Sequence, residues 1–463
     1  MAAKCIAGLL SAFCIAFSLA CPAKSQSAPK FVQLPRNVTS ALYLPESGAL
    51  PTSGIVIMHR EANYMNNIAC REFARRGFAV LCMNSRFVNN ESSVKWELIP
   101  LDVGEGVKFL RDVQKVGKII LYGSSGGGVT MSFYQAVAEN GPKVCQGAKK
   151  LVKCSDNLAG LPKADGIILV DGHPGNPILR LRSINPAISG DLGNPTVDAD
   201  LDPFDPKNGY VADGPSRYSD EFKAKYFRAQ ATRMNKLIEL AQSKMLDLKA
   251  GKSFYTDDEP FNVPGLDGAR LQSLDLSIRH TTAVPQKLLR NDGSISVQVV
   301  ESIAPARPNL AKAAKTFKEG ARGGLTLQSF LSSNAIRADD SLDESKIDLC
   351  SSNNSTPCML QNVSVPLLAA AMQGSYQNLI QEIEINYNYA KTADKDFIVV
   401  EGATTQVTPC KFCSGDVGKY SNATKVFFDY AAAWIRRREE SPHVDLPSVG
   451  FSASKPAIPS GGE

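Results

Sequence analysis

Residues 118–128 read KIILYGSSGGG, and this stretch decides the fold. The apolar run at 118–122 predicts a buried strand, and the residues after Ser125 predict a helix to about residue 138. Between them, residues 123–127 follow the pattern G-x-S-x-G in a strand-turn-helix setting. The glycines leave room for a sharp turn in which Ser125 takes a strained backbone conformation. We therefore predict that Ser125 is an exposed nucleophile and that the amide of Gly126 faces developing negative charge.

Two other kinds of glycine-rich loop do not fit this stretch. A phosphate-binding P-loop needs a lysine before its serine or threonine, and a dinucleotide-binding loop needs G-x-G-x-x-G. Residues 123–128 contain neither pattern. We therefore predict no nucleotide cofactor at this turn.

Short apolar runs alternate with amphipathic segments on both sides of the turn. Such runs are typical of parallel strands covered by helices on both faces, so the predicted fold class is α/β, with a mostly parallel sheet flanked by helices. The predicted strands are 55–58, 79–83, 118–122, 166–170, 365–371 and 396–400. The other predicted helices of this part are 67–76, 102–114 and 423–438.

The alternation stops between about residues 179 and 362. This stretch is rich in Pro, Asp, Asn and Gly and contains one long predicted helix, 220–250. We predict a core formed by residues 29–178 and 363–440, interrupted by a large cap insertion at 179–362. Residues 441–463, with several Pro, Ser and Gly, are predicted to be a flexible tail.

The composition is that of a globular protein of 463 residues, with 43% hydrophobic and 21% charged residues. Lysines and arginines number 51 against 46 acidic residues, so the net charge is +5, without a basic block. We therefore predict no nucleic-acid partner.

The N-terminal residues 1–20 are typical of a signal peptide, with an apolar run from Cys5 to Leu19 and then Ala20. The run is shorter than the roughly 20 residues that a membrane span needs, and no other segment approaches that length. We predict a secreted or periplasmic protein without a membrane span. A lipoprotein is less favoured, because Leu19 is not at the usual distance from Cys21.

Six cysteines lie in close pairs, which in an exported chain predict disulfides that close short loops. The pairs are Cys145 with Cys154, Cys350 with Cys358, and Cys410 with Cys413. Cys70 and Cys82 fit buried thiols as well as a fourth disulfide. The spacing of Cys410 and Cys413 also occurs in redox and zinc sites, but no thioredoxin-like unit or matching second pair accompanies it.

The sequence resembles the α/β-hydrolase superfamily over about residues 50–175 and 362–438. The resemblance rests on Ile-Met-His-Arg at 57–60, Asn84–Phe87, the turn at 123–128, Asp171–Gly175 and Val400–Ala403. Bacterial proteins of this fold with a long insertion over the active site are the most similar. The resemblance implies an acyl-serine intermediate without metal or cofactor, and a second oxyanion amide near Arg60. We therefore expect an exported serine hydrolase acting on a small-molecule substrate, a carboxylic ester.

The family pattern fails at the base of Ser125. The family places its acid after the strand at 365–371 and its histidine after the strand at 396–400. Neither place supplies the expected residue, and Thr405 occupies the histidine position. Threonine cannot exchange a proton near neutral pH, so Ser125 lacks its usual base.

Few residues can replace this base. His173, with Asp171 as its acid, follows a predicted strand at the sheet edge where ligands bind in α/β folds. The alternative is that His173 only fixes its Pro-Gly turn. His280 of the insertion and His443 of the tail are weaker candidates, and His59 is expected to shape its own loop.

Two further hypotheses concern acids and activity. Glu382 and Glu384 could replace the family acid, but they fit an ordinary helix face better. The competing interpretation of the whole protein is a degenerate hydrolase fold that binds a small apolar ligand or carries out non-hydrolytic chemistry. The sequence leaves the substrate and the oligomeric state open.

An acidic loop has oxygen ligands at spacings that suit calcium. Its members are Asp198, Asp200, Asp202, Asp205 and Asn208. The glycine and glutamate that an EF-hand loop needs are replaced by Pro203 and Gly209. We predict a solvated loop and no metal site.

Overall fold

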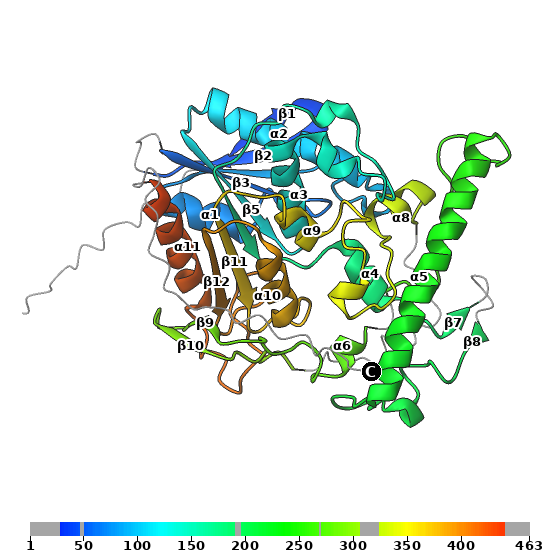
Figure 1. Cartoon of the computed structure of the whole chain (residues 1–463). Helices are drawn as coiled ribbons and strands as arrows, with labels where there is room; N and C mark the ends of the chain where they lie inside the picture. The colour runs from blue at the N-terminus through cyan, green and yellow to red at the C-terminus, as the bar shows by residue number, and fades with distance from the viewer. Residues whose placement is uncertain (1–27, 47–50, 190–195, 268–269, 306–323, 440–463) are drawn as a thin grey trace, which may run out of the picture.

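The fold is seen in a computed structural model that describes residues 28–46, 51–189, 196–267, 270–305 and 324–439 (Figure 1). The predicted signal peptide, the predicted tail and His443 lie outside the described residues. Within the described part of the chain, no helix is long and apolar enough to cross a membrane.

A ten-stranded sheet forms the centre of the molecule. In spatial order its strands are β1 (Lys30–Leu34), β2 (Val38–Tyr43), β4 (Ala79–Asn84), β3 (Ser53–His59), β5 (Lys118–Ser124), β6 (Gly166–Val170), β11 (Leu367–Met372), β12 (Lys395–Val400), β9 (Gln286–Leu289) and β10 (Ile295–Gln298). The strands from β4 to β9 in this order run parallel. β1, β2 and β10 join the two edges by antiparallel pairing.

Helices cover both faces of the sheet, because the buried strands present apolar residues on both sides. One face is covered by α1 (Ile68–Arg75) and α11 (Ala423–Glu439), which share a core cluster with alternate strand residues (Figure 1). The other face is covered by α2 (Ile99–Lys108), α3 (Gly126–Asn140) and α10 (Ile380–Tyr389). This arrangement confirms the predicted α/β class, and each predicted strand is found within two residues of its expected bounds.

The predicted insertion at 179–362, in which the sequence shows no alternation of strands and helices, adds two strands to the sheet. β9 pairs with β12, and β10 pairs with β9 at the edge. Leu288 and Leu289 of β9 are buried in the core clusters on opposite faces of the sheet. Both strands are only four residues long and β10 is largely exposed, so neither gives a long apolar run in the sequence.

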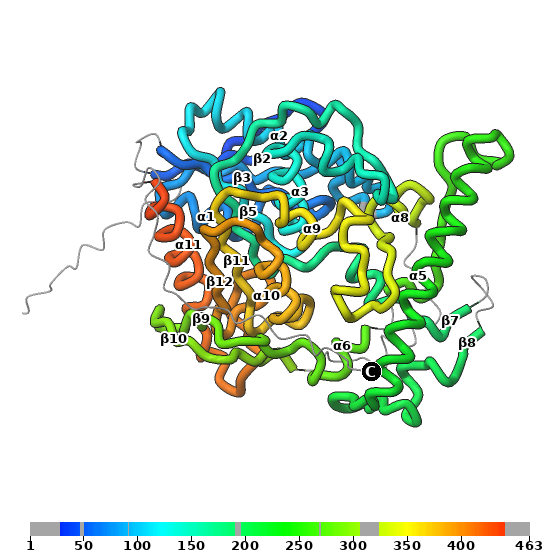
Figure 2. The backbone as a smooth tube through the Cα atoms, in the orientation of Figure 1, coloured from blue at the N-terminus to red at the C-terminus, as the bar shows by residue number. Residues whose placement is uncertain are grey.

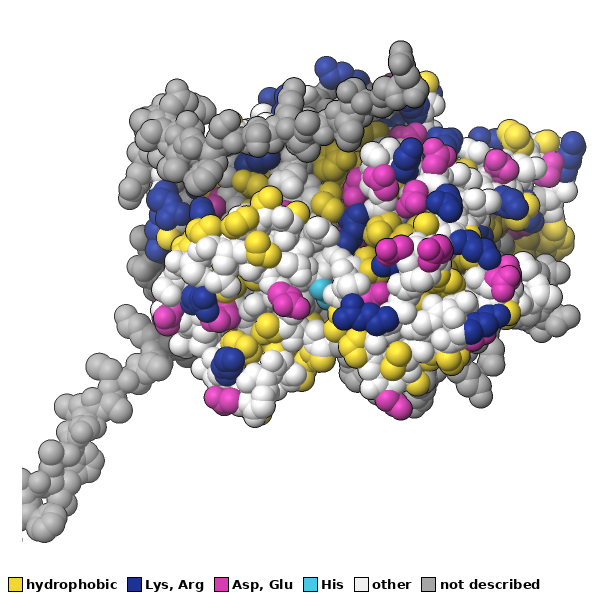
Figure 3. All heavy atoms as spheres, turned by 60° about the horizontal axis from the view of Figure 1, so that its bottom comes forward, with side chains coloured by type: hydrophobic (Ala, Val, Ile, Leu, Met, Phe, Trp, Pro, Cys, Tyr) yellow, Lys and Arg dark blue, Asp and Glu magenta, His cyan; other side chains and the backbone are white. Residues whose placement is uncertain are grey.

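The rest of the insertion and its flanks are helical or irregular. The helices are α4 (Asn176–Ser183), α5 (Asp220–Lys249), α6 (Leu271–Leu274), α8 (Leu327–Ser333) and α9 (Thr356–Leu360), and a small separate sheet pairs β7 (Ile188–Ser189) with β8 (Thr196–Val197). Figure 2 shows α5 running along one side of the molecule, away from the main sheet. On the face drawn in Figure 3, positive and negative side chains are interspersed.

All three predicted cysteine pairs form disulfides. Cys70 and Cys82, which the sequence left open, form a fourth. This bridge links α1 to β4, so it joins a covering helix to the sheet.

Candidate functional site

Ser125 lies in the turn between β5 and α3, at the carboxyl end of the parallel strands. Its backbone has φ 53° and ψ −119°, a conformation that is rare for residues other than glycine. The Ser125 amide donates to the carbonyl of Val170 at 2.9 Å, which ties the turn to β6. Strained backbone of this kind clusters at functional sites.

Close approaches explain the glycines around Ser125. A Cβ on Gly123 would collide with the carbonyl of Gly127, and a Cβ on Gly126 would lie 2.6 Å from Nε2 of His59. A side chain at either position would force the turn or its neighbours to move. The glycine pattern therefore reflects packing as well as backbone freedom.

His59, Arg60 and Glu61 follow β3 and lie beside Gly126. His59 Nδ1 lies 3.1 Å from the Ala62 amide nitrogen and 3.4 Å from Glu61 Oε2, and its Nε2 faces Gly126. Arg60 is buried and forms an ion pair with Glu61. Although burial opposes ionisation of Glu61, Arg60 and His59 hold its pKa at about 2. The structure thus brings the two predicted oxyanion residues, Gly126 and Arg60, together.

Asp171 is the first residue after β6, and its side chain is completely buried. Its Oδ2 accepts hydrogen bonds from Ser375 Oγ at 2.8 Å and from Asn378 Nδ2 at 3.1 Å, and the Thr405 side chain also acts to lower its pKa. Burial raises the pKa of Asp171 to about 6 in spite of these hydrogen bonds.

Thr405 and Ser375 join the loops that follow β12 and β11. Their hydroxyl oxygens are 2.8 Å apart. The neighbouring loop residues are also connected, since the Gly374 amide donates to the Ala403 carbonyl at 2.8 Å. The superfamily resemblance places an acid in the loop after β11 and a histidine in the loop after β12. In this protein the two loops meet near Asp171, and they carry the hydroxyls of Ser375 and Thr405 instead.

The side chain of Ser125 has one hydrogen-bond contact within the described residues. Asn378 Nδ2 lies 3.5 Å from Ser125 Oγ and also donates to the Asp171 carbonyl at 2.7 Å. The amide of Asn378 cannot accept a proton, so it positions Ser125 without activating it. No histidine or carboxylate of the described chain hydrogen-bonds the Ser125 hydroxyl.

His173 is buried in a turn, and in the described structure no hydrogen bond joins it to Ser125 or to the Asp171 carboxylate. Its Nδ1 accepts the Gly175 amide at 3.1 Å, as expected if it fixes the Pro-Gly turn. Burial, together with the nearby charge of Arg60, holds its pKa well below the usual range. In this neutral tautomer Nε2 carries a proton and cannot receive one.

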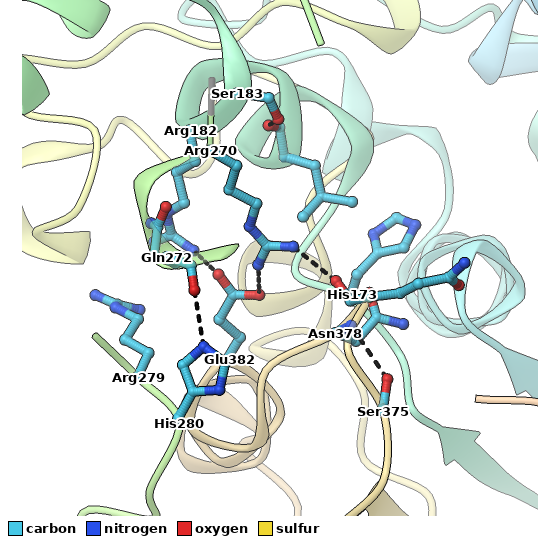
Figure 4. Close-up of polar contacts among 12 residues, drawn as sticks. His173, Arg182, Ser183, Arg270, Gln272, Arg279, His280, Ser375, Asn378 and Glu382 are labelled. Atoms are coloured by element: carbon cyan, nitrogen blue, oxygen red, sulfur yellow. Dashed lines mark hydrogen bonds and ion pairs between the residues drawn. The ribbon is translucent and has the colours of Figure 1, made fainter. Parts of the chain in front are cut away.

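His280 lies away from Ser125. Its Nε2 is 2.7 Å from the carbonyl of Gln272, and Figure 4 shows it on the far side of Glu382 from Asn378. This hydrogen bond joins His280 to another residue of the insertion.

Glu382 and Glu384 both lie in the helix α10, where both are only 1% exposed. Glu382 pairs with Arg182 at 3.1 Å and with Arg270 at 2.7 Å. Glu384 accepts the Ala283 amide at 2.6 Å. These acids hold the insertion on α10, and within the described residues neither forms a hydrogen bond with Ser125.

The acidic loop uses its carboxylates in turns. Asp198, Asp202 and Asp205 each accept a backbone amide two residues further along the chain. Within the described residues, no cluster of three or more His, Cys, Asp or Glu side chains is arranged to hold a metal ion.

Ser375 and Asn378 are the site residues that the sequence did not indicate. Both lie in the loop after β11, which enters the site because β11 is the neighbour of β6 in the sheet. The only available signal was their position directly after a buried strand.

The strand order, the crossover helices and the turn at Ser125 define the α/β-hydrolase fold, which the sequence resemblance predicted. No protein-family model matches the sequence. No curated protein matches it either.

Several solved structures are similar to this chain. One is described as DcsB in complex with its substrate analogue, at 12% identity and a TM-score of 0.44, covering 89% of this chain and 100% of that chain. Another is the siderophore hydrolase EstB from Aspergillus fumigatus, at 10% identity and a TM-score of 0.41, covering 90% and 99%. A third is Est1E from Butyrivibrio proteoclasticus, at 8% identity and a TM-score of 0.38, covering 90% and 100%.

Proposed function

We propose that this protein is an exported serine hydrolase that cleaves a small carboxylic ester through an acyl-serine intermediate on Ser125. The observation that carries the proposal is the strained turn at Ser125, held by close packing at the N-terminus of α3. A backbone of this kind is costly and is kept where a reactive side chain must project from the sheet.

The surroundings of Gly126 support acyl transfer. The N-terminus of α3 follows Ser125 directly, and Nε2 of His59 lies against Gly126, the residue proposed to supply an oxyanion amide. Preorganised donors of this kind stabilise the charge that develops in ester hydrolysis. Four disulfides accord with a protein that folds in an oxidising compartment, outside the cytoplasm.

One observation favours a second candidate, a degenerate hydrolase fold that binds a small molecule. Thr405 stands where the superfamily has its histidine, and its hydroxyl bonds Ser375 and not Ser125. In this case the site at Ser125 binds a small molecule without bond cleavage. The two candidates differ in whether the Ser125 hydroxyl is reactive.

Labelling with a fluorophosphonate probe tests the proposal. We expect an adduct on the peptide containing Ser125, because the probe reports an activated serine in a functional oxyanion site. Ser125→Ala should abolish the adduct. Ser132→Ala is the matched control, since Ser132 lies in α3 with its hydroxyl bonded to the Gly128 carbonyl, and it should leave labelling unchanged. A folded protein that takes no label would support the second candidate.

A further inference from the structure

We propose that the hydroxyls of Thr405 and Ser375 pass the proton of Ser125 to the carboxylate of Asp171, in place of the missing imidazole. This inference rests on the proposed function, because it supplies the base that a nucleophilic Ser125 needs.

The direction of the hydrogen bonds follows from their partners. The Asn378 backbone amide donates to Ser375 Oγ at 3.3 Å (Figure 4), and Ser375 Oγ donates its single proton to Asp171 Oδ2 at 2.8 Å. In the remaining contact of Ser375 Oγ, Thr405 Oγ1 is therefore the donor, at 2.8 Å. The three groups form an ordered chain that ends on a carboxylate.

Thr405 is the entry to this chain. It stands at the carboxyl edge of the sheet, and Ser124 Oγ lies 3.5 Å from its carbonyl, so its loop borders the nucleophile turn. In the proposal one water carries the proton from Ser125 to Thr405, because no hydrogen bond joins these two side chains within the described residues. The contact with Asn378 assists, because Ser125 Oγ accepts from that amide and keeps its own proton for transfer.

Asp171 is suited to receive the proton. The groups that contact its carboxylate are Ser375, Asn378, Thr405 and the Met372 amide, and all of them are neutral. Burial without a cationic partner brings its pKa close to the range in which a general base works best at neutral pH.

The loop after β11, which carries Ser375, packs against the loop after β12, which carries Thr405. The Gly374 amide donates to the Ala403 carbonyl, and a Cβ on Gly374 would lie 2.8 Å from the Cβ of Cys410. Cys410 is bridged to Cys413 within the loop after β12. Gly374 of the loop after β11 therefore packs against a turn that a disulfide closes. This packing keeps the two hydroxyls within hydrogen-bond distance without substrate.

The proposed step balances. In acylation, a bond forms between Ser125 Oγ and the acyl carbon, and the bond from that carbon to the alcohol oxygen breaks. The Ser125 proton moves to Thr405 as the Thr405 proton moves to Ser375 and the Ser375 proton moves to Asp171, so no hydroxyl holds an extra proton, and the same chain returns a proton to the leaving alkoxide. In deacylation, water replaces the alcohol, Ser125 recovers its proton, and the acid is released. Nothing is oxidised or reduced.

The test compares labelling rates of Ser125 by a fluorophosphonate in full-length variants. Thr405→Val keeps the side-chain shape but removes the hydroxyl, and we expect the rate to fall by about 100-fold or more. Thr405→Ser keeps the hydroxyl and should stay within about fivefold of the wild type. Asp171→Asn should fall like Thr405→Val and lose the dependence of the rate on a group titrating near pH 6. Circular dichroism confirms folding of each variant.

The variant Thr405→His distinguishes failure of the proton relay from failure of the proposed hydrolase function. It places an imidazole beside Asp171, so it should raise the labelling rate if the acid and the turn are intact. Equal rates for Thr405→Val and the wild type would overturn the relay while Ser125 remains reactive. An inert wild type with a reactive Thr405→His would also overturn the relay and would favour the binding candidate. No labelling of either protein would contradict the proposed function itself, and the relay with it.

Discussion

At the scale of single residues, Asp171 makes the stability of the folded protein depend on pH. Its pKa is raised by burial from 3.8 to about 6. The folded state therefore holds this proton more tightly, and the stability it contributes is complete below pH 3.8 and is lost as the pH rises through about 6. Two pKa units correspond to about 3 kcal/mol.

We expect Asp171→Asn, which cannot ionise, to gain stability relative to the wild type between about pH 4 and about pH 7.5, by up to about 3 kcal/mol. Urea unfolding at both pH values measures the difference. A difference in unfolding free energy between the two proteins that does not change with pH would contradict the raised pKa of Asp171. Asp165→Asn, at a partly exposed carboxyl, is the control and should show little change in its gap.

At the same scale, only part of the site could be predicted from the sequence. Ser125, Gly126 and Asp171 directly follow buried apolar runs, and a motif or a strand end marks each of them. Ser375 and Asn378 have no such mark, because no spacing rule tells that a polar loop residue faces the end of another strand. Their contacts depend on β11 lying beside β6, which is a property of the sheet order.

At the scale of elements, the passage from β5 to α3 is tightly packed against the loop after β3. A methyl group on Gly126 would lie 2.6 Å from His59 Nε2 and 3.1 Å from Arg60 Nη1. We expect Gly126→Ala to cost about 1–3 kcal/mol of unfolding free energy through overpacking, and to slow labelling of Ser125.

Thermal or urea unfolding checks this expectation for Gly126→Ala, with Gly147→Ala as control. A Cβ on Gly147 meets no atom within 4 Å, so its substitution should be close to neutral. If both variants were equally stable, the packing of His59 against Gly126 would be looser than described.

Elements also show why sequence patterns find some strands and miss others. β3, β5 and β6 are buried on both faces and appear as continuous apolar runs. β9 and β10 are short, and only Leu288 and Leu289 of β9 are buried. Their place in the sheet follows from pairing with β12, a contact between residues far apart in the chain.

At the scale of the whole molecule, buried ion pairs fasten the insertion to the core. Arg182 of α4 pairs with Glu382 of α10 and with Glu344. Arg270 pairs with Glu382, and Arg279 pairs with Glu344. Figure 4 shows Arg182 and Arg270 at Glu382. Arg182 and Glu382 are both 1% exposed. This network spans segments far apart in the sequence, so it fixes the position of the insertion above α10.

Glu382→Ala leaves Arg182 and Arg270 short of a partner inside the protein, and we expect it to cost about 3–5 kcal/mol. Lys425→Ala removes one side of an exposed pair with Asp429 and should cost no more than about 1 kcal/mol. Denaturant unfolding of the two variants measures the contrast. Similar losses for both would show that the buried network does not hold the insertion.

The most direct test of the account is whether Ser125 carries an acyl group during turnover. The protein is mixed with p-nitrophenyl acetate, quenched in acid within seconds and digested for mass spectrometry. The account predicts one acetyl group on the Ser125 peptide, release of nitrophenol, and neither in Ser125→Ala. Folded wild-type protein that releases nitrophenol without acetylated Ser125, or that shows neither, would contradict it.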